Sequence, residues 1–379
     1  MIVATLLALL SLAIWLVLLF GRGFFWLTRE RDDRDAPPEP DAWPSIAAVV
    51  PARNEAELIA RSVGSLLAQD YPGRFRVVLV DDQSGDGTGA AARALGDERL
   101  TVLDGAAHPA GWTGKLFAVH QGVAHANAKE PPDYLWLTDA DIAHAPDNLR
   151  RLVARAEAHK FVLNSLMAKL HCESFAERFL IPAFVFFFDM LFPFAWANDP
   201  QKRIAAAAGG CMLIKREALA RAGGIESIRH AIIDDCALAR RMKMQGPIWL
   251  GFTERAASLR PYPRIADIRA MVSRSAYAQL GYSPLVLAGT VLGMALLYVV
   301  PLAALLTGGL GALGGALAWA AMPIAFQPML HFYRLSPFWG LAMPLIGVFY
   351  AAFTIDSAAQ HWRGRGGMWK GRAQAIAPT

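Results

Sequence analysis

The sequence is poor in cysteine and in charged residues. Its three cysteines, Cys172, Cys211 and Cys236, stand at wide spacings that suit neither a disulfide framework nor a zinc site, so we expect buried thiols in a reducing compartment. Charged residues make up only 18% of the chain, and the net charge of +5 is modest. The basic residues collect beside apolar segments and form no stripe that suits a duplex. This pattern argues against nucleic acid as a partner and favours anionic lipid headgroups.

Hydrophobic residues are correspondingly abundant, at 55% of the 379 residues, and the mean hydropathy is +0.30. Residues 1–20 are uncharged and long enough to cross a bilayer. Basic residues follow this run, at Arg22, Arg29 and Arg31, whereas a cleaved signal peptide carries them first. We therefore expect a transmembrane anchor over residues 1–22 of a multi-pass protein of the cell inner membrane. The positive-inside tendency places the following domain in the cytoplasm.

Residues 23–44 are expected to form a juxtamembrane linker, because they include the Pro-rich and acidic stretch "DAPPEPDAWP". From residue 45 to residue 260, apolar runs that end in polar residues alternate with segments of helical spacing. "SIAAVVPA", "RFRVVLVDD", "RLTVLD" and "DYLWLTD" read as strands, with helices over 55–69 and 115–128. This succession predicts a doubly wound α/β domain with a mostly parallel sheet, whose ligands bind at the carboxyl ends of the strands.

The C-terminal third predicts a membrane-embedded region. Residues 261–283 fit amphipathic interfacial helices, residues 284–358 contain three uncharged runs of spanning length, and residues 359–379 form a basic tail. The second run is rich in Gly and Ala, which suits close helix packing or a re-entrant path. Three crossings from a cytoplasmic domain would leave the basic tail outside, against the positive-inside tendency. We therefore expect that one of the three runs does not cross.

An aromatic segment over residues 178–197 also stands out. It contains Asp189 and two prolines, so we expect an interfacial segment or the wall of an acceptor channel in preference to a span.

Acidic residues follow two of the predicted strands. In "VLVDDQSGDGT", Asp82 and a Gly-rich turn open a helix, an arrangement that can hold a base or ribose or can be a capped turn. It lacks the G-x-G-x-x-G fingerprint, which disfavours a dinucleotide. In "WLTDAD", Asp139 and Asp141 are spaced i and i+2 at a strand end. They suit Mg²⁺, which prefers hard oxygen ligands, although an acidic solvated turn has the same sequence.

Four further motifs carry candidate site residues, each with a structural alternative. "VVPARNE" places Arg53 and Glu55 at the ligand edge or merely at a helix start. Lys115 begins a helix, where a cation is unfavourable unless an anion such as a diphosphate lies nearby; a solvated lysine is the alternative. Gly209 and Gly210 indicate either close approach of a ligand or packing. Asp234 and Asp235 open an amphipathic helix, which such acids stabilise without any function.

Together, in this order, these motifs resemble the family 2 glycosyltransferases with a GT-A fold, over about residues 45–282. The anchor, the C-terminal runs and "GWTGK" resemble membrane-bound members that glycosylate lipids, in the ceramide glucosyltransferase-like branch that includes the hopene-associated glycosyltransferases of bacterial hopanoid gene clusters.

The resemblance implies roles for individual residues. Glu55 and Asp82 would contact the nucleotide, with Arg53 beside them, and Asp139 and Asp141 would meet the metal and diphosphate. Asp235 would be the general base, and Asp234 takes the place where the family often has Glu. Only Arg274 of "MVSRS" matches the family's Gln-x-x-Arg-Trp motif, which points to a single, non-processive transfer. Gly209 and Gly210 would lie on the acceptor side.

The expected function is therefore an inverting glycosyltransferase that uses Mg²⁺ or Mn²⁺. It would move a sugar from a nucleotide-diphosphate sugar, expected to be a UDP-sugar, to the hydroxyl of a membrane lipid such as a hopanoid. Two alternatives stay open: transfer to a polyprenyl phosphate, and a catalytically silent membrane subunit that binds a nucleotide sugar.

Overall fold

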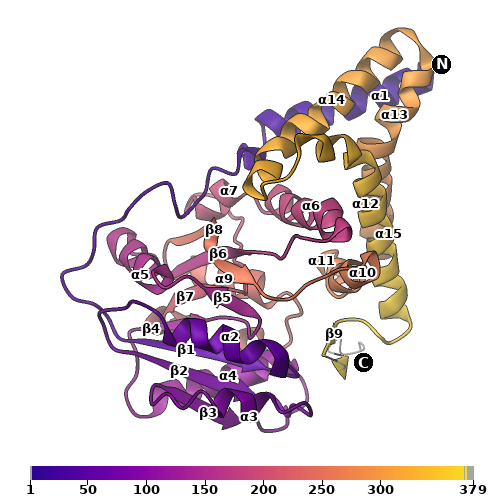
Figure 1. Cartoon of the computed structure of the whole chain (residues 1–379). Coiled ribbons are helices and arrows are strands. Elements are labelled where there is room, and N and C mark those ends of the chain that lie inside the picture. Colours follow the sequence, from indigo (N-terminus) through magenta and orange to yellow (C-terminus); the bar gives the residue numbers. More distant parts are fainter. Residues whose placement is uncertain (1, 371, 374–379) are drawn as a thin grey trace.

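A computed structural model describes residues 2–370 and 372–373 of the chain. Its centre is an eight-stranded sheet with the strand order β3-β2-β1-β4-β7-β6-β8-β5 (Figure 1). The strands are β1 (Ile46–Ala52), β2 (Phe75–Asp81), β3 (Leu100–Asp104), β4 (Tyr134–Leu137), β5 (Ile142–His144), β6 (Leu163–Lys169), β7 (Met212–Lys215) and β8 (Ile248–Ser258).

One half of the sheet follows the predicted parallel pattern. β1 pairs in parallel with both β2 and β4, so that Ala48 lies opposite Val77 on one side and Trp136 on the other. All seven residues of β1 are buried, as expected for a strand with helices on both faces. α2 (Ala56–Leu67) and α5 (Asn148–His159) cover one face, and α4 (Gly114–Ala128), α8 (Arg216–Arg221) and α9 (Asp234–Lys243) cover the other. The short α3 (Thr88–Arg93) follows β2.

The other half of the sheet is mixed. β7 runs antiparallel to both β4 and β6, and β5 runs antiparallel to β8, so three of the seven neighbouring pairs are antiparallel. The predicted α/β fold is confirmed, but its sheet is less parallel than the sequence indicated. β5 follows β4 after only four residues, without the helical crossover that a parallel connection needs.

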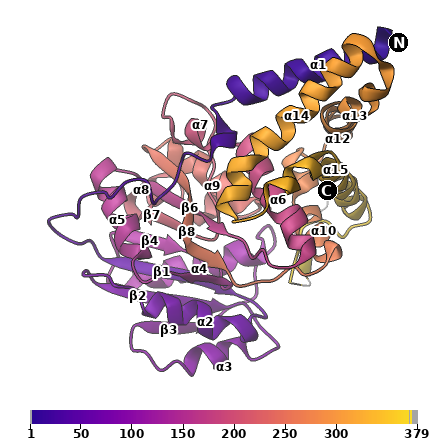
Figure 2. The same cartoon turned by 45° about the horizontal axis from the view of Figure 1, so that its top comes forward.

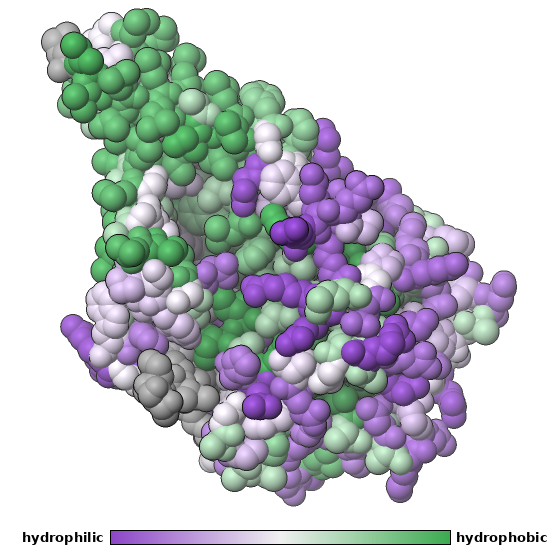
Figure 3. All heavy atoms as spheres, turned by 180° about the vertical axis from the view of Figure 1, so that it is seen from behind, coloured by the Kyte–Doolittle hydropathy of each residue, from purple (hydrophilic) through white to green (hydrophobic). Residues whose placement is uncertain are grey.

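Among the described residues, four helices are long and apolar enough to cross a membrane, as the sequence predicted: Ile2–Phe20, Pro284–Thr307, Gly309–Phe332 and Pro337–Trp362. Figure 3 shows their apolar side chains gathered on a projection beyond the polar domain. α1 (Ile2–Phe20) lies along α14 (Gly309–Phe332) in both ribbon views (Figures 1 and 2). A Cβ at Gly311 would come within 2.9 Å of the Thr5 hydroxyl oxygen. The glycines of α14 therefore allow the predicted close packing.

The run before α14 is irregular. It contains α12 (Pro284–Met294), the π-helical turn Ala295–Val299, α13 (Val300–Ala304) and the 3₁₀ turn Leu305–Thr307. After α14 come the 3₁₀ helix Pro337–Ala342 and α15 (Met343–Trp362).

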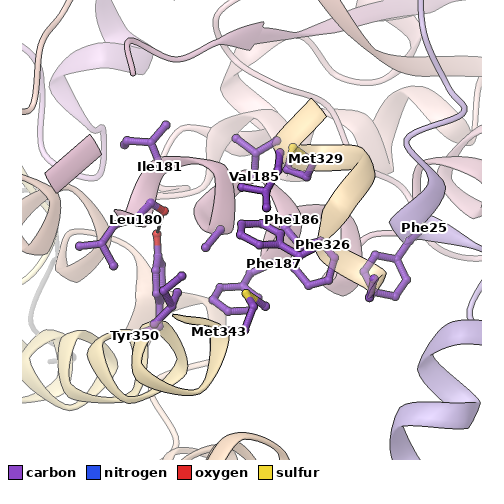
Figure 4. Packing of buried hydrophobic residues seen from close by; sticks show 14 of the residues in the cluster. Phe25, Leu180, Ile181, Val185, Phe186, Phe187, Phe326, Met329, Met343 and Tyr350 are labelled. Atoms are coloured by element: carbon purple, nitrogen blue, oxygen red, sulfur yellow. Dashed lines mark hydrogen bonds between the residues drawn. The ribbon is translucent and has the colours of Figure 1, made fainter. Parts of the chain in front are cut away.

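The aromatic segment forms α6 (Phe175–Leu191), followed by the short α7 (Phe194–Asn198). At 17 residues, α6 is not one of the span-length helices. It packs between the domain and the C-terminal helices, with the Phe186 and Phe326 ring centroids 5.3 Å apart (Figure 4). The Tyr350 hydroxyl of α15 donates to the carbonyl oxygen of Leu180 at 2.8 Å. The length of α6 agrees with the prediction that the segment does not span the membrane.

Two connecting segments are more fixed than the sequence suggested. Residues 261–283 form two short helices, α10 (Ile265–Ser273) and α11 (Ala276–Gln279), and the Ser273 hydroxyl of α10 donates to Asp356 of α15 at 2.8 Å. The Pro-rich linker has no regular structure of its own, but Asp35 pairs with Arg155 and Glu39 with Arg150, both on α5. The linker therefore runs along the surface of the domain.

Candidate active site

A cavity of about 490 Å³ opens at the edge of the sheet where β1, β4 and β8 end and β7 begins. It is lined by ten of the eleven predicted site residues: Arg53, Glu55, Lys115, Asp139, Asp141, Gly209, Gly210, Asp234, Asp235 and Arg274. These residues come from six separate stretches of the sequence. Because strands that point the same way end at one edge, the fold gathers these stretches into a single site.

Asp82 is the exception among the predicted residues. Its side chain is only 2% exposed and does not line the cavity. It lies behind Arg53, with 3.7 Å between the guanidinium and the carboxylate. The neighbouring Gly-rich turn has the features of the capped turn that was the alternative to a ligand site. Asp86 accepts hydrogen bonds from the backbone N–H groups of Thr88 and Ala56. A contact of Asp82 with a nucleotide stays a prediction.

Lys115 lies between two of the acidic motifs and contacts Asp139 of one and Asp234 of the other. The Thr113 hydroxyl caps α4 by accepting from the Leu116 N–H, which fixes the first turn that carries Lys115. The Lys115 ammonium lies 2.9 Å from Asp139 and 3.1 Å from Asp234. Burial disfavours its charged form, but these two carboxylates outweigh burial and raise the pKa of Lys115. The anions that the sequence led us to expect beside Lys115 include these carboxylates of the chain itself.

Asp235 has the environment of a poised base. Its carboxylate accepts from the backbone N–H groups of Gly209 at 3.1 Å and Cys236 at 2.7 Å. Burial and the neighbouring Asp234 charge raise the pKa of Asp235 to about 6, against the opposing effects of Lys115 and the two hydrogen bonds. A carboxylate with this pKa is ionised at neutral pH and remains basic enough to accept a proton.

The two glycines serve different purposes. A Cβ at Gly209 would lie 3.4 Å from the Lys115 nitrogen, 3.7 Å from Asp235 and 3.8 Å from Asp139, so this glycine leaves space among three functional groups. A Cβ at Gly210 would instead press on Ala168 and Ile142 at 3.3 Å. Gly209 thus fits the predicted close approach of a ligand, and Gly210 fits the packing alternative although it also lines the cavity.

Arg260 is a charged residue of the cavity that the sequence reasoning missed. It follows β8, donates from Nε to Asp141 at 2.8 Å, and pairs through Nη2 with Glu55. These two carboxylates raise the pKa of Arg260 even though burial lowers it. The available signal was weak: an arginine between an apolar strand and "PYP", in a segment without an acidic motif.

A buried carboxylate on α6 holds the segment that carries Arg260. Glu177 is 1% exposed and accepts from the Tyr262 N–H at 2.6 Å, as well as from the Ser174 N–H and the His171 ring. Burial alone would raise its pKa, but these hydrogen bonds together lower the pKa of Glu177 to about 2. The aromatic helix therefore orients the residues of the polar site.

The cavity has a second, apolar half. Side chains of α6 and α10 line it together with residues of β6 and the residue after it: Phe184, Phe188, Met271, Met167 and Leu170. A polar pocket that continues into an apolar groove can hold a charged ligand and a hydrophobic one side by side.

Asp139 and Asp141 are the carboxylates that the sequence assigned to a divalent metal. Within the described part of the chain, no group of three or more His, Cys, Asp or Glu side chains is arranged to hold an ion. Asp139 and Asp141 are two half-buried carboxylates at a strand end, each already facing a cation. Mg²⁺ and Mn²⁺ are commonly held by one or two carboxylates together with phosphate oxygens and water. The pair therefore fits a metal that arrives with a diphosphate, and it does not form a complete cage.

The sheet order and the strand-end site define a GT-A domain, and comparison with known proteins agrees. Residues 47–223, just under half of the chain, match the family described as Glycosyl transferase family 2. A mannosyltransferase from Pyrobaculum calidifontis, solved with GDP-Man and Mn²⁺, shares the fold with a TM-score of 0.58 at 22% identity. That match covers 95% of this chain and 99% of the mannosyltransferase.

Two curated relatives are similar over shorter regions. Succinoglycan biosynthesis protein ExoO of Rhizobium meliloti (strain 1021) is 36% identical over 124 residues, which is 32% of each chain. A 4,4'-diaponeurosporenoate glycosyltransferase of Staphylococcus aureus (strain bovine RF122 / ET3-1) is 37% identical over 82 residues, covering 22% of this chain and 21% of the relative. The matches therefore span about a third or less of these relatives.

Proposed function

We propose that the protein is an inverting glycosyltransferase that moves one sugar from a nucleotide-diphosphate sugar to the hydroxyl of a membrane lipid. The observation that carries this proposal is the single cavity in which a cluster of carboxylates and cations continues into a groove lined by Phe184, Phe188 and Met271. The groove faces helices that pack on the span-length segments. The polar half suits the donor and the apolar half suits a lipid.

On the donor side, Asp139 and Asp141 would hold Mg²⁺ or Mn²⁺, which when bound neutralises charge on the leaving diphosphate. The mannosyltransferase of the same fold was solved with Mn²⁺ and GDP-Man, which supports this choice. Lys115, Arg260 and Arg274 line the same half and supply positive charge at the diphosphate. Glu55 and Asp82, which lies behind Arg53, are the proposed nucleotide contacts.

On the acceptor side, Asp235 would remove the proton from the attacking hydroxyl. The new bond joins the acceptor oxygen to the anomeric carbon, while the bond from that carbon to the diphosphate oxygen breaks. The proton stays on Asp235, and the nucleoside diphosphate leaves with the electron pair. Because the hydroxyl must approach from the face opposite the leaving group, the configuration at the anomeric carbon inverts.

A hydroxyl acceptor fits this site better than a polyprenyl phosphate. A phosphate oxygen is already ionised at neutral pH and needs no base, whereas the site holds Asp235 with a pKa near 6 beside Gly209. A silent subunit would have no need for the four carboxylates around Lys115 and Arg260. The resemblance to hopene-associated enzymes makes a hopanoid the first acceptor to test. Acceptance of a carotenoid acid is the second, because the Staphylococcus relative is named for one.

The location follows from the same picture. We propose that the protein is a multi-pass protein of the inner membrane. Its catalytic domain would face the cytoplasm, where nucleotide sugars are made. Arg22 and Arg29 after α1 support this orientation.

The test is a product assay with the full chain in lipid nanodiscs. The protein is incubated with Mn²⁺, separate UDP- and GDP-sugars, and a hopanoid, a carotenoid acid, a polyprenyl phosphate or a membrane lipid extract. Mass spectrometry then reports a lipid that has gained a hexose or N-acetylhexosamine, and the Asp235→Asn variant is the matched blank. We expect a glycosylated lipid hydroxyl. Absence of any product with every donor would overturn the proposal, and transfer only to the polyprenyl phosphate would replace it with the alternative.

A further inference from the structure

The basic tail reaches the candidate active site. α15 ends at Trp362, and a strap of residues 363–370 then crosses to the loop after β1, on the opposite wall of the cavity. The Lys370 ammonium lies 2.8 Å from the Glu55 carboxylate and donates to the Asn54 carbonyl oxygen at 3.1 Å. Gly367 and Lys370 both line the cavity. The sequence analysis used these residues only as a guide to membrane topology, so this contact is a separate finding.

Lys370 contacts a carboxylate that shares its other cation with Asp141. Glu55 is 8% exposed and pairs with Arg260 as well as with Lys370. Arg260 also pairs with Asp141, so two carboxylates share two cations at this point. An anion that enters beside Glu55 would meet both cations in one place.

The charges around the cavity support the same view. Five cations of the described residues line it: Arg53, Lys115, Arg260, Arg274 and Lys370. Six carboxylates line it: Glu55, Asp139, Asp141, Asp234, Asp235 and Asp267. Without Lys370 the balance would be four cations against six carboxylates, which repels an anionic donor. Lys370 is thus a substantial part of the positive charge available to a diphosphate.

We propose that Lys370 is a donor-binding residue: the strap closes the nucleotide side of the cavity and brings the Lys370 ammonium to the diphosphate of a nucleoside diphosphate sugar. This inference rests on the proposed function, because it assumes that such a donor binds between Glu55 and Asp139. The strap continues directly from α15, which packs on the α6 and α10 walls of the acceptor half. Donor closure and the lipid groove are therefore attached to one helix.

The test compares three variants of the full chain in nanodiscs. Lys370→Gln removes the ammonium, Lys370→Arg keeps a cation, and Arg365→Gln removes the same charge from an exposed position of the same strap. Equilibrium dialysis with radiolabelled UDP or GDP and Mn²⁺ measures binding, and steady-state rates give KM and kcat. We expect Lys370→Gln to weaken nucleoside diphosphate binding and raise the donor KM about tenfold, as for a lost hydrogen bond to a charged group. We expect the acceptor KM of Lys370→Gln to stay near the wild-type value. For Lys370→Arg and Arg365→Gln, we expect nucleoside diphosphate binding and the donor KM to stay near the wild-type values.

The outcomes separate the two proposals. If the wild type binds neither UDP nor GDP, the proposed function fails and the role of Lys370 falls with it. If the wild type binds one of them and Lys370→Gln binds it equally well, only the inference on the strap is overturned. Tighter binding by Lys370→Gln also overturns it, because the strap would then be a plug that competes with the donor.

Discussion

Arg260 donates from Nε to the Asp141 carboxylate at 2.8 Å, although 119 residues separate the two in the sequence. The same guanidinium pairs with Glu55. Arg260 therefore connects the proposed nucleotide contact, Glu55, to the proposed metal ligand, Asp141. Arginine can do this because its planar fork presents several donors at once. Arg260 thereby holds both carboxylates in place at the point where the diphosphate is proposed to lie.

The first prediction concerns this arginine. Arg260→Gln is expected to lower kcat/KM for the donor by about a hundredfold to a thousandfold, as for other donors that face developing negative charge. Arg260→Lys keeps the charge but cannot span two carboxylates, so it should recover only part of the rate. The control is Arg264→Gln, whose side chain is 78% exposed and pairs with Asp267 in the first turn of α10. Equal rates for Arg260→Gln and Arg264→Gln would contradict the assignment.

The second prediction is the pH dependence set by Asp235. A general base works only when it is ionised, and the pKa of Asp235 is raised to about 6 by burial and by Asp234. The rate is therefore expected to rise with pH through about 6 and then to level off. Asp235→Asn should remove this rise and lower kcat by about a hundredfold to ten-thousandfold. Product formation followed between acidic and neutral pH gives the profile, and a variant that turns over at the wild-type rate would favour a phosphate acceptor.

The third prediction separates space for a ligand from packing. Gly209→Ala places a methyl group 3.4 Å from the Lys115 nitrogen, an ordinary contact that the fold can accept. We expect thermal stability within about 0.5 kcal/mol of the wild type but a rate about a hundredfold lower, because the reacting groups are displaced. Gly64→Ala on α2, where no atom lies within 4 Å of the added Cβ, is the control and should keep full activity. A fully active Gly209→Ala would show that the glycine serves packing only.

The sequence indicated that Asp139 and Asp141 reach the edge of the sheet, because they follow a buried apolar run and the strand ends meet there. It did not indicate that Asp82, which follows another such run, lies behind Arg53 and does not line the cavity. It also predicted the helices before Gln69 and after Lys115. It could not predict Arg260 or Lys370, whose partners lie 205 and 315 residues away along the chain and depend on β8 and α15. Nor could it rank Gly209 above Gly210, since only the neighbouring atoms distinguish a gap left for a ligand from a tight contact.

Contacts at both ends of the last apolar run bear on the conflict over the basic tail. Arg334, just before Pro337–Trp362, pairs with Glu254 of β8 at 3.0 Å. Lys370, just after it, pairs with Glu55. α14, in contrast, begins beside the N-terminal end of α1, where Gly311 meets Thr5. The run Pro284–Thr307 therefore leads away from the domain, α14 returns to it, and α15 starts and finishes on the domain side.

The last prediction follows from this arrangement: α15 lies along the domain and does not cross the bilayer. Single cysteines at Ser336 and Arg365, in a Cys172→Ser background, are expected to react with a membrane-impermeant maleimide from the same side as Glu98→Cys on the domain. Leu306→Cys, at a side chain that is 91% exposed at the far end, should react from the opposite side. Labelling is compared in right-side-out and inverted vesicles. If Ser336→Cys and Arg365→Cys reacted from opposite sides, α15 would be a true span, and the strap could not reach Glu55 in the membrane-bound protein.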